Sequence, residues 1–314
     1  MDTGKRMKFV MIGTSTLALA GAGAILIGLA AKREGDTRTG RTQEIAPVRL
    51  TLPEPGPPSQ TPATVAPAIE PMIGEDAQPP VLEAGETYYG KGEGFYRSGD
   101  FAAASRHLAV EVDLHPERFH PTYLLGLSLW KEGRIEDSIT TLQRASLIDP
   151  ASVKSRVNLG RVLNDAGRFE EGLAAATEAL VLVPEDSSAL NVQGRARLNL
   201  GRRAEAIDSF RSAIEKDPGN AYALNNLGYA LIGDGGCAEA VPILEEAVRI
   251  RPDIGYFHNN LGMAYERTGR REEAREEYRK AVEAGGSEAA VSNRARLEAS
   301  GGAGETTIPE PAEK

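Results

Sequence analysis

A fixed spacing of 34 residues is the strongest constraint on how this chain can fold. Glycines and prolines recur at that step in three separate series from residue 85 onward. A period of this length is typical of repeat architectures, in which each repeat is one supersecondary unit. The first glycine series is Gly92, Gly126, Gly160, Gly194, Gly228 and Gly262, the second is Gly99, Gly133, Gly167, Gly201, Gly235 and Gly269, and the prolines are Pro116, Pro150, Pro184, Pro218 and Pro252.

One unit, residues 119–152, explains the period physically. Leu125 and Leu129 lie at helical spacing on one face of a predicted helix. The first glycine series lacks a Cβ on that face and lets a second helix approach closely. Gly133 is expected to end the first helix with a positive φ, and Pro150 prevents the second helix from continuing. Each unit is therefore expected to be a helical hairpin whose apolar face needs a neighbouring unit.

The repeat resembles the tetratricopeptide repeat. The stretches that carry the resemblance are Ala223-Leu224-Asn225-Asn226-Leu227-Gly228-Tyr229 and Asn259-Asn260-Leu261-Gly262-Met263-Ala264-Tyr265. It implies an all-α fold, a right-handed α-solenoid of six helix-turn-helix units at residues 85–118, 119–152, 153–186, 187–220, 221–254 and 255–288. A further amphipathic segment at residues 289–300 is expected to cap the last hairpin, with Val291, Ala295 and Leu297 as its apolar contacts.

In the family that this chain resembles, ligands bind a concave groove lined by the first helix of each unit. Asn can donate to and accept from a peptide backbone, Arg can meet a carboxylate with two hydrogen bonds, and Tyr offers contact area at small entropic cost. The same asparagines can instead hydrogen-bond to a neighbouring helix, and the tyrosines can pack on the preceding unit. The predicted peptide-binding groove consists of Asn158, Arg161, Asn191, Arg195, Tyr222, Asn225, Asn226, Tyr229, Tyr256, Asn259, Asn260 and Met263.

The N-terminal part of the chain has a different character. Residues 1–8 form a basic tail, and residues 9–31 are 23 consecutive residues without a charge. This exceeds the ~20 residues that a helix needs to cross the hydrocarbon layer, so we expect a transmembrane signal-anchor in the lipid bilayer. Small residues in the run also suit a cleavable signal peptide, which would leave the protein secreted or periplasmic. In both cases we expect the repeats to lie outside the cytoplasm, in the periplasm of a bacterial cell.

Two segments, residues 32–84 and residues 301–314, are expected to be disordered. The first contains ten prolines, a density that leaves no helical or strand period. It is expected to act as a tether that holds the folded part away from the bilayer. The second is rich in Gly, Glu and Pro and forms the C-terminal tail.

Charge and composition argue against several classes of partner and site. The formal net charge of −9 argues against a nucleic-acid partner, whose phosphates must be neutralised by Lys and Arg. The single cysteine, Cys237, excludes an intrachain disulfide and a thiolate metal cluster. No nucleophile, base and orienting group coincide in the sequence, so we expect neither an enzyme nor a cofactor. The sequence thus predicts a membrane-tethered scaffold for protein or peptide partners, or alternatively an accessory subunit that localises an envelope enzyme or polymer-export complex.

Overall fold

The computed structural model describes residues 79–285 and 288–299, and these residues form thirteen α-helices and no β-strand. The chain divides into two units, Met1–Pro62 and Ala63–Lys314, and every described residue belongs to the second. The predicted segments 1–8, 9–31 and 301–314, and residues 32–78 of the predicted tether, lie outside the described residues. The helices are α1 (Tyr88–Ser98), α2 (Phe101–Leu114), α3 (Phe119–Lys131), α4 (Ile135–Ile148), α5 (Val153–Asp165), α6 (Phe169–Leu182), α7 (Ser187–Asn199), α8 (Arg203–Lys216), α9 (Ala221–Gly233), α10 (Cys237–Ile250), α11 (Gly255–Arg267), α12 (Arg271–Glu283) and α13 (Glu288–Ala299).

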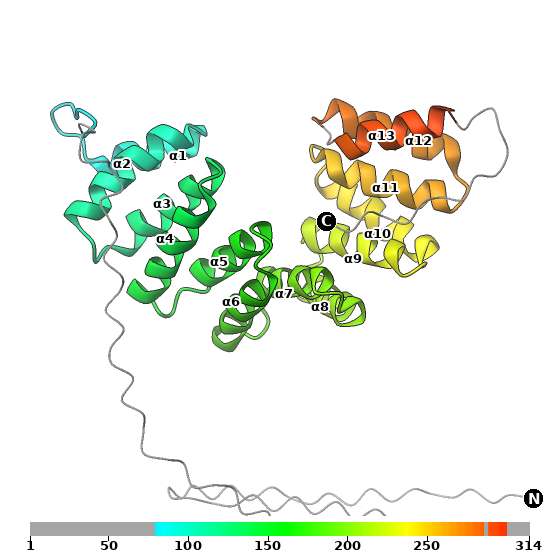
Figure 1. Ribbon diagram of the computed structural model, residues 1–314, viewed down its shortest axis with the longest axis horizontal. Helices are drawn as coiled ribbons and strands as arrows, with labels where there is room; N and C mark the ends of the chain where they lie inside the picture. The colour runs from blue at the N-terminus through cyan, green and yellow to red at the C-terminus, as the bar shows by residue number, and fades with distance from the viewer. Residues whose placement is uncertain (1–78, 286–287, 300–314) are drawn as a thin grey trace, which may run out of the picture. The chain divides into compact units, whose positions relative to one another are not determined.

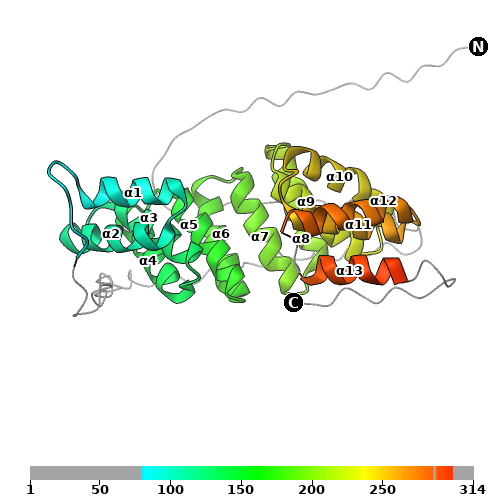
Figure 2. The same ribbon diagram turned by 90° about the horizontal axis from the view of Figure 1, so that it is seen from above.

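The helices pair in chain order. Six hairpins, from α1–α2 to α11–α12, follow one another, and α13 packs on α12 (Figures 1 and 2). The second helix of each hairpin packs against the first helix of the next one. This arrangement confirms the predicted all-helical repeat architecture. Among the helices of the described ranges, none combines the length and the apolar character needed to cross a membrane.

Local hydrogen bonds set the helix ends. Gly133 adopts a φ of 81° after α3, and the next N–H, that of Arg134, donates to the carbonyl oxygen of Leu129 at 2.9 Å. This is the left-handed glycine closure that the sequence predicts. At the start of α7, Asp186 Oδ1 accepts from the Ala189 N–H at 2.7 Å. Such side-chain caps satisfy amides that have no partner inside the helix.

In five of the six hairpins a glycine of the first helix faces a bulky side chain of the second, and in α5–α6 Gly160 faces the small residues Gly172 and Ala175. A Cβ built on Gly126 would lie 2.8 Å from Cγ and Cδ2 of Leu142, and Leu142 is fully buried. Ser138 Oγ donates to the carbonyl oxygen of Gly126 at 2.7 Å. The missing Cβ therefore lets α3 and α4 approach closely enough for a buried hydrogen bond between them.

The last helix, α13, is attached by a partly buried ionic contact. Arg296 donates from both Nη atoms to the carboxylate of Glu266, at 2.6 and 2.7 Å, and Tyr278 Oη donates to the same carboxylate at 2.8 Å. These bonds join α13 to α11 and α12. A carboxylate that accepts two hydrogen bonds from one guanidinium holds it in a single orientation, so the contact orients α13 on the last hairpin.

The prediction for two apolar contacts of this last helix is wrong. Val291 is 45% exposed, and Ala295 is exposed as well. The buried residues are Ala290 and Leu297. They lie seven residues apart, on one stripe of the helix, and this stripe turns Val291 towards solvent.

We predict that Gly126→Ala destabilises the protein by about 1–3 kcal/mol, because the new Cβ overlaps Leu142 in a filled core. The matched control is Gly94→Ala in the first helix of another hairpin, where a Cβ would meet nothing within 4 Å. This control should gain about 0.5–1 kcal/mol, since alanine loses less backbone entropy than glycine in a helix. Urea unfolding of both variants measures the difference, and equal stabilities would contradict the packing assignment.

Candidate functional site

The candidate site lies on the face formed by the first helices α1, α3, α5, α7, α9 and α11, called here the inner face. Successive first helices contact one another, whereas no comparable packing joins successive second helices in the part of the chain that the structure describes. Figure 1 shows α6 below α5, on the outer side of the stack. The stack is tighter on the side of the first helices, and this makes the inner face the concave one.

A fixed pairing across repeats governs this face. The fifth residue of one repeat faces the sixth residue of the next, so the paired residues are 35 positions apart. At three junctions the pair is joined by a hydrogen bond from an asparagine amide. The pairs are Asn158 to Tyr123 Oη (2.6 Å), Asn226 to Asn191 Oδ1 (3.0 Å) and Asn260 to Asn225 Oδ1 (2.9 Å).

The remaining junctions use apolar pairs at the same two positions. Val157 and Val192 belong to one buried cluster, and Tyr89 and Leu124 each pack against another. A polar residue therefore meets a polar residue, and an apolar residue meets an apolar one. This matching avoids an unpaired amide in the interface, which would cost free energy.

Most of the predicted asparagines consequently have partners inside the protein. Asn225 and Asn260 are 2% and 8% exposed, and Asn225 also donates to Asn226 Oδ1 at 3.4 Å. Asn259 Oδ1 accepts from Asn293 of α13 at 3.0 Å. Of the two roles open to these amides, the structure shows the contact with a neighbouring helix. Binding of a ligand by them stays a prediction.

The tyrosines of the predicted groove are more accessible. Tyr222 and Tyr256 are 44% and 45% exposed. Both rings stand edge-on to the fully buried Phe257, with centroids 5.7 and 4.9 Å away. Loss of hydration, followed by the neighbouring Tyr222 phenol, raises the pKa of Tyr256 to about 12. Its hydroxyl is therefore protonated at neutral pH and can donate a hydrogen bond.

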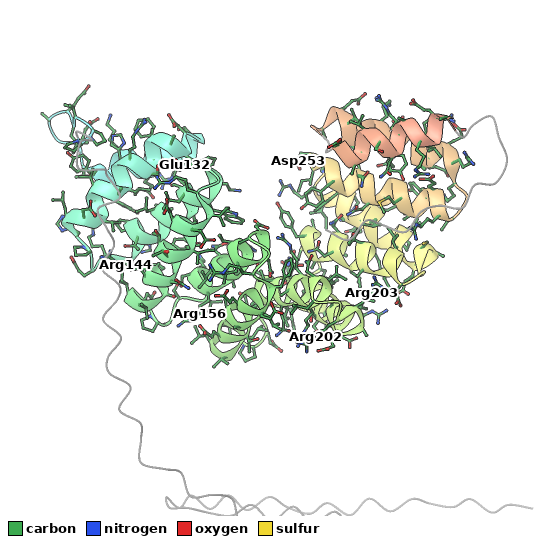
Figure 3. All side chains as sticks on the ribbon, viewed as in Figure 1. Glu132, Arg144, Arg156, Arg202, Arg203 and Asp253 are labelled. Atoms are coloured by element: carbon green, nitrogen blue, oxygen red, sulfur yellow. The ribbon has the colours of Figure 1, made fainter. Side chains whose placement is uncertain are left out.

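Beside the tyrosines lies an intramolecular ion pair. Arg251 bonds Asp253 through Nε and Nη2, at 2.9 and 2.8 Å, and its guanidinium carbon lies 6.0 Å from the Tyr222 ring centre. Figure 3 shows Asp253 well away from Arg202 and Arg203, which lie at α8. The charge of Arg251 is thus neutralised next to the exposed aromatic pair.

The two predicted arginines differ in their surroundings. Arg195 forms an ion pair with Asp165, whose other oxygen accepts from Trp130 Nε1 at 3.0 Å. Arg161 is half-buried, and its Nη1 donates to Asn158 Oδ1 at 3.1 Å. Asp165 was not among the predicted site residues, although its 35-residue spacing from Trp130 matches the other junction pairs.

The last two predicted residues, Tyr229 and Met263, are half-buried. Met263 packs against the buried cluster of the C-terminal hairpins and accepts a weak hydrogen bond from Asn259 Nδ2 at 3.6 Å. Met263 therefore contributes to packing, and the inner face offers its accessible chemistry mainly through the two exposed tyrosines and the arginines.

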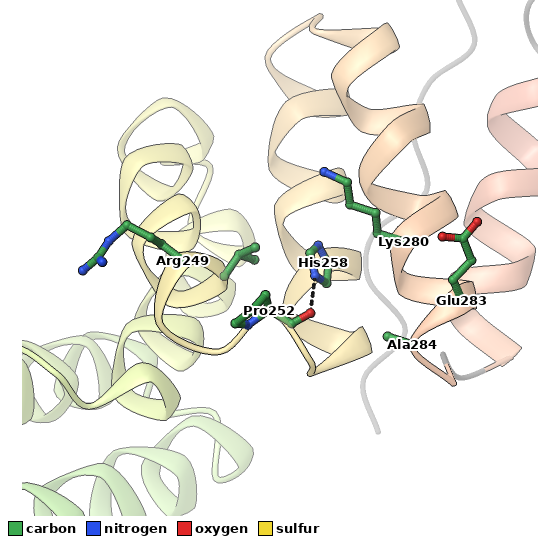
Figure 4. A pocket seen from close by; sticks show the side chains of 7 residues that line it. Arg249, Pro252, His258, Lys280, Glu283 and Ala284 are labelled. Carbon is green, nitrogen blue, oxygen red and sulfur yellow. Dashed lines mark hydrogen bonds between the residues drawn. The ribbon is translucent and has the colours of Figure 1, made fainter.

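A pocket of about 470 Å³ lies elsewhere, between α10 and α12 (Figure 4). Its buried group is His258, whose Nε2 lies 3.0 Å from the Pro252 carbonyl oxygen and whose Nδ1 lies 2.6 Å from Glu277. The hydrogen bond with Glu277 raises the pKa of His258 against the opposing effect of burial. Lys280 also bonds Glu277, at 2.8 Å, so these groups are occupied with one another and leave little for a ligand.

We predict that Asn225→Val costs about 1–3 kcal/mol, because it leaves the buried Asn260 amide without its acceptor. Adding Asn260→Val should recover most of this loss, since the double variant recreates the valine pair that joins α5 and α7. Urea unfolding of the two single variants and the double variant measures the coupling. Additive losses would show that the amides are not paired in solution.

Comparison with known proteins identifies the family of these repeats. A family model described as tetratricopeptide repeat matches residues 89–153, 157–221 and 225–289, together more than half of the chain. Among curated protein sequences, none matches this chain.

Solved structures share the fold. One is a chain of the APC/C hetero-tetramer Cut9–Hcn1, with a TM-score of 0.60 and 16% identity over 67% of this chain and 42% of that chain. Another is TTC0263, a thermophilic TPR protein of Thermus thermophilus, with a TM-score of 0.50 and 21% identity over 58% of this chain and 98% of that one. This chain therefore spans less than half the length of the first relative. With its hairpins and its matching repeats, the chain belongs to the tetratricopeptide repeat family.

Proposed function

We propose that this protein is a non-catalytic scaffold that is tethered to a membrane and binds partner proteins or peptides on its inner face. The observation that carries the proposal is the exposed pair Tyr222 and Tyr256, held in place by the buried ring of Phe257. Large exposed aromatic rings with fixed orientations are typical of residues that dominate protein interfaces. The family supports the same role, because tetratricopeptide repeats generally bind proteins.

The surroundings of the two tyrosines favour a peptide over a small molecule. The rings project from two successive first helices, α9 and α11, so a ligand that contacts both must extend along the stack. Tyrosine combines an apolar ring with a hydroxyl donor, which suits both side chains and backbone carbonyls of an extended chain. The inner face therefore provides contact area and donors spread over several repeats.

Membrane tethering rests on residues 9–31 and on the proline-rich tether that follows. The uncharged run is long enough to span a bilayer. A tether of residues 32–84 would let the repeats reach partners at a distance from the membrane surface. We place the repeats on the periplasmic side, where the scaffold would collect other proteins of the cell envelope.

We predict that Tyr222→Ala combined with Tyr256→Ala weakens partner binding about tenfold or more, since aromatic anchors carry much of an interface's free energy. A photo-crosslinking residue at position 222 or 256 of the full chain should capture a partner in cells. The control position is Val181, which is 76% exposed on the second helix α6. Capture from Val181 alone, or unchanged affinity in the double alanine variant, would place the binding surface elsewhere.

We predict that the full chain stays with the membrane fraction at alkaline pH, because residues 9–31 span the bilayer. The repeats should resist protease in intact cells and be digested once the outer barrier is opened. Removal of residues 9–31 is the control and should release the protein. Resistance until the cytoplasm is lysed would contradict the periplasmic placement, and loss of the N-terminus from the mature protein would show a cleaved signal peptide.

A further inference from the structure

Arg161 lies on the inner face and has no carboxylate partner among the residues that the structure describes. Arg195 is paired with Asp165, and Arg251 with Asp253. Within residues 79–285 and 288–299, Arg161 has no carboxylate oxygen within 4.0 Å, and its hydrogen bond goes to the neutral amide of Asn158, at 3.1 Å. A guanidinium carries five N–H donors, so most of the donors of Arg161 are available to a ligand.

The cause is a single position of the repeat. Arg161 and Arg195 both occupy the ninth position of their repeats, and Asp165, the partner of Arg195, lies 30 residues before it. The residue 30 positions before Arg161 is Lys131. The register that gives Arg195 a carboxylate partner thus has a lysine at the corresponding position for Arg161. Lys131 is exposed, and its ammonium lies 5.0 Å from the centre of the Trp130 ring.

The surroundings of Arg161 suit an anion. Burial lowers the pKa of Arg161 and the nearby Arg195 charge acts in the same direction, while the Tyr123 and Tyr222 phenols and Asp186 oppose this. An arginine stays protonated in proteins, so the half-buried charge is under-compensated, which is unfavourable until an anion binds. Asp186 is already engaged as the cap of α7.

The phenol of Tyr123 is linked to the same guanidinium through Asn158. Tyr123 Oη accepts from Asn158 Nδ2 at 2.6 Å, which leaves its own O–H free to donate. The Tyr222 phenol of α9 acts in the same direction as Tyr123 and opposes the lowering of the Arg161 pKa by burial. The guanidinium of Arg161 presents N–H donors in one plane, and a tyrosine hydroxyl and ring lie on the same face of the protein. This combination suits a carboxylate whose neighbouring groups are apolar.

We propose that Arg161 binds the carboxylate of an aspartate, a glutamate or a C-terminus in an extended partner peptide, whose neighbouring side chains rest on Tyr222 and Tyr256. This rests on the proposed function and names the chemistry of its ligand. The chain has a net charge of −9, so its overall field does not attract an acidic partner. Recognition of the carboxylate depends instead on the contact at Arg161, whose positive charge determines where the acid of the peptide lies.

The test uses the full chain and a library of extended nine-residue peptides with aromatic and aliphatic flanks, each made with a central Glu and with a central Gln. The unmodified protein should bind the Glu form roughly tenfold more tightly, as expected for hydrogen bonds to a charged group. Arg161→Gln should reduce this preference to about one. The control Arg203→Gln, at the start of α8 (Figure 3), should leave it unchanged.

A second variant leaves Arg161 in place. Lys131→Asp puts a carboxylate at the position that Asp165 holds for Arg195, so the protein should neutralise Arg161 itself and lose the preference for Glu. Lys154→Asp makes the same charge change at an exposed position of α5 and should keep the preference. In the unmodified protein, the Nε–H resonance of Arg161 should shift with the Glu peptide and not with the Gln peptide.

The outcomes separate the two proposals. Equal affinity for Glu and Gln forms, or a preference that survives both Arg161→Gln and Lys131→Asp, overturns the carboxylate assignment. If those peptides still lose affinity in the Tyr222→Ala and Tyr256→Ala variant, the inner face remains the binding surface. If neutralising Glu70, Glu75 and Asp76 of this chain raises peptide affinity about tenfold, its own acidic segment occupies the site, and the assignment to a partner is wrong.

Discussion

The close approach of the two helices within each hairpin is the constraint on which the rest of the structure depends. At the C-terminal hairpin a Cβ on Gly262 would lie 2.7 Å from Cδ1 and Cε1 of Tyr278, and Tyr278 is fully buried. Only a residue without a side chain leaves room for that ring. Since Tyr278 also donates to Glu266, which binds Arg296 of α13, the attachment of the last helix depends on the same close contact.

Contacts within hairpins do not specify how one hairpin meets the next, and the paired fifth and sixth positions supply that information. The amide pair Asn225–Asn260 joins α9 to α11, and Val157 of α5 and Val192 of α7 share one buried apolar cluster. An amide placed opposite a valine would lose its hydrogen bond without gaining solvent. Each repeat therefore packs more favourably against its own neighbouring repeat than against a different one, and this favours one order and one register of repeats.

The fold could be predicted from the sequence because its determinants are local and repeated. The glycine closure at Gly133 and the hairpin period each follow from a few neighbouring residues. The partners of the asparagines could not be predicted, since the contact between the fifth and sixth positions depends on the angle between successive hairpins. The burial of Ala290 in place of Val291 has the same origin, because the residues that contact α12 depend on how α13 lies on it.

The two predicted arginines show most clearly what three-dimensional structure adds. In the sequence Arg161 and Arg195 are equivalent, but the residue 30 positions earlier is Lys131 for one and Asp165 for the other. One junction of the inner face is thereby positive and the next is neutral, and the exposed rings of Tyr222 and Tyr256 follow further along the stack. Such a face is asymmetric from end to end. An extended ligand with an acid at one end and apolar groups at the other can satisfy it in one direction only, so the order of charges along the repeats would determine the polarity of binding.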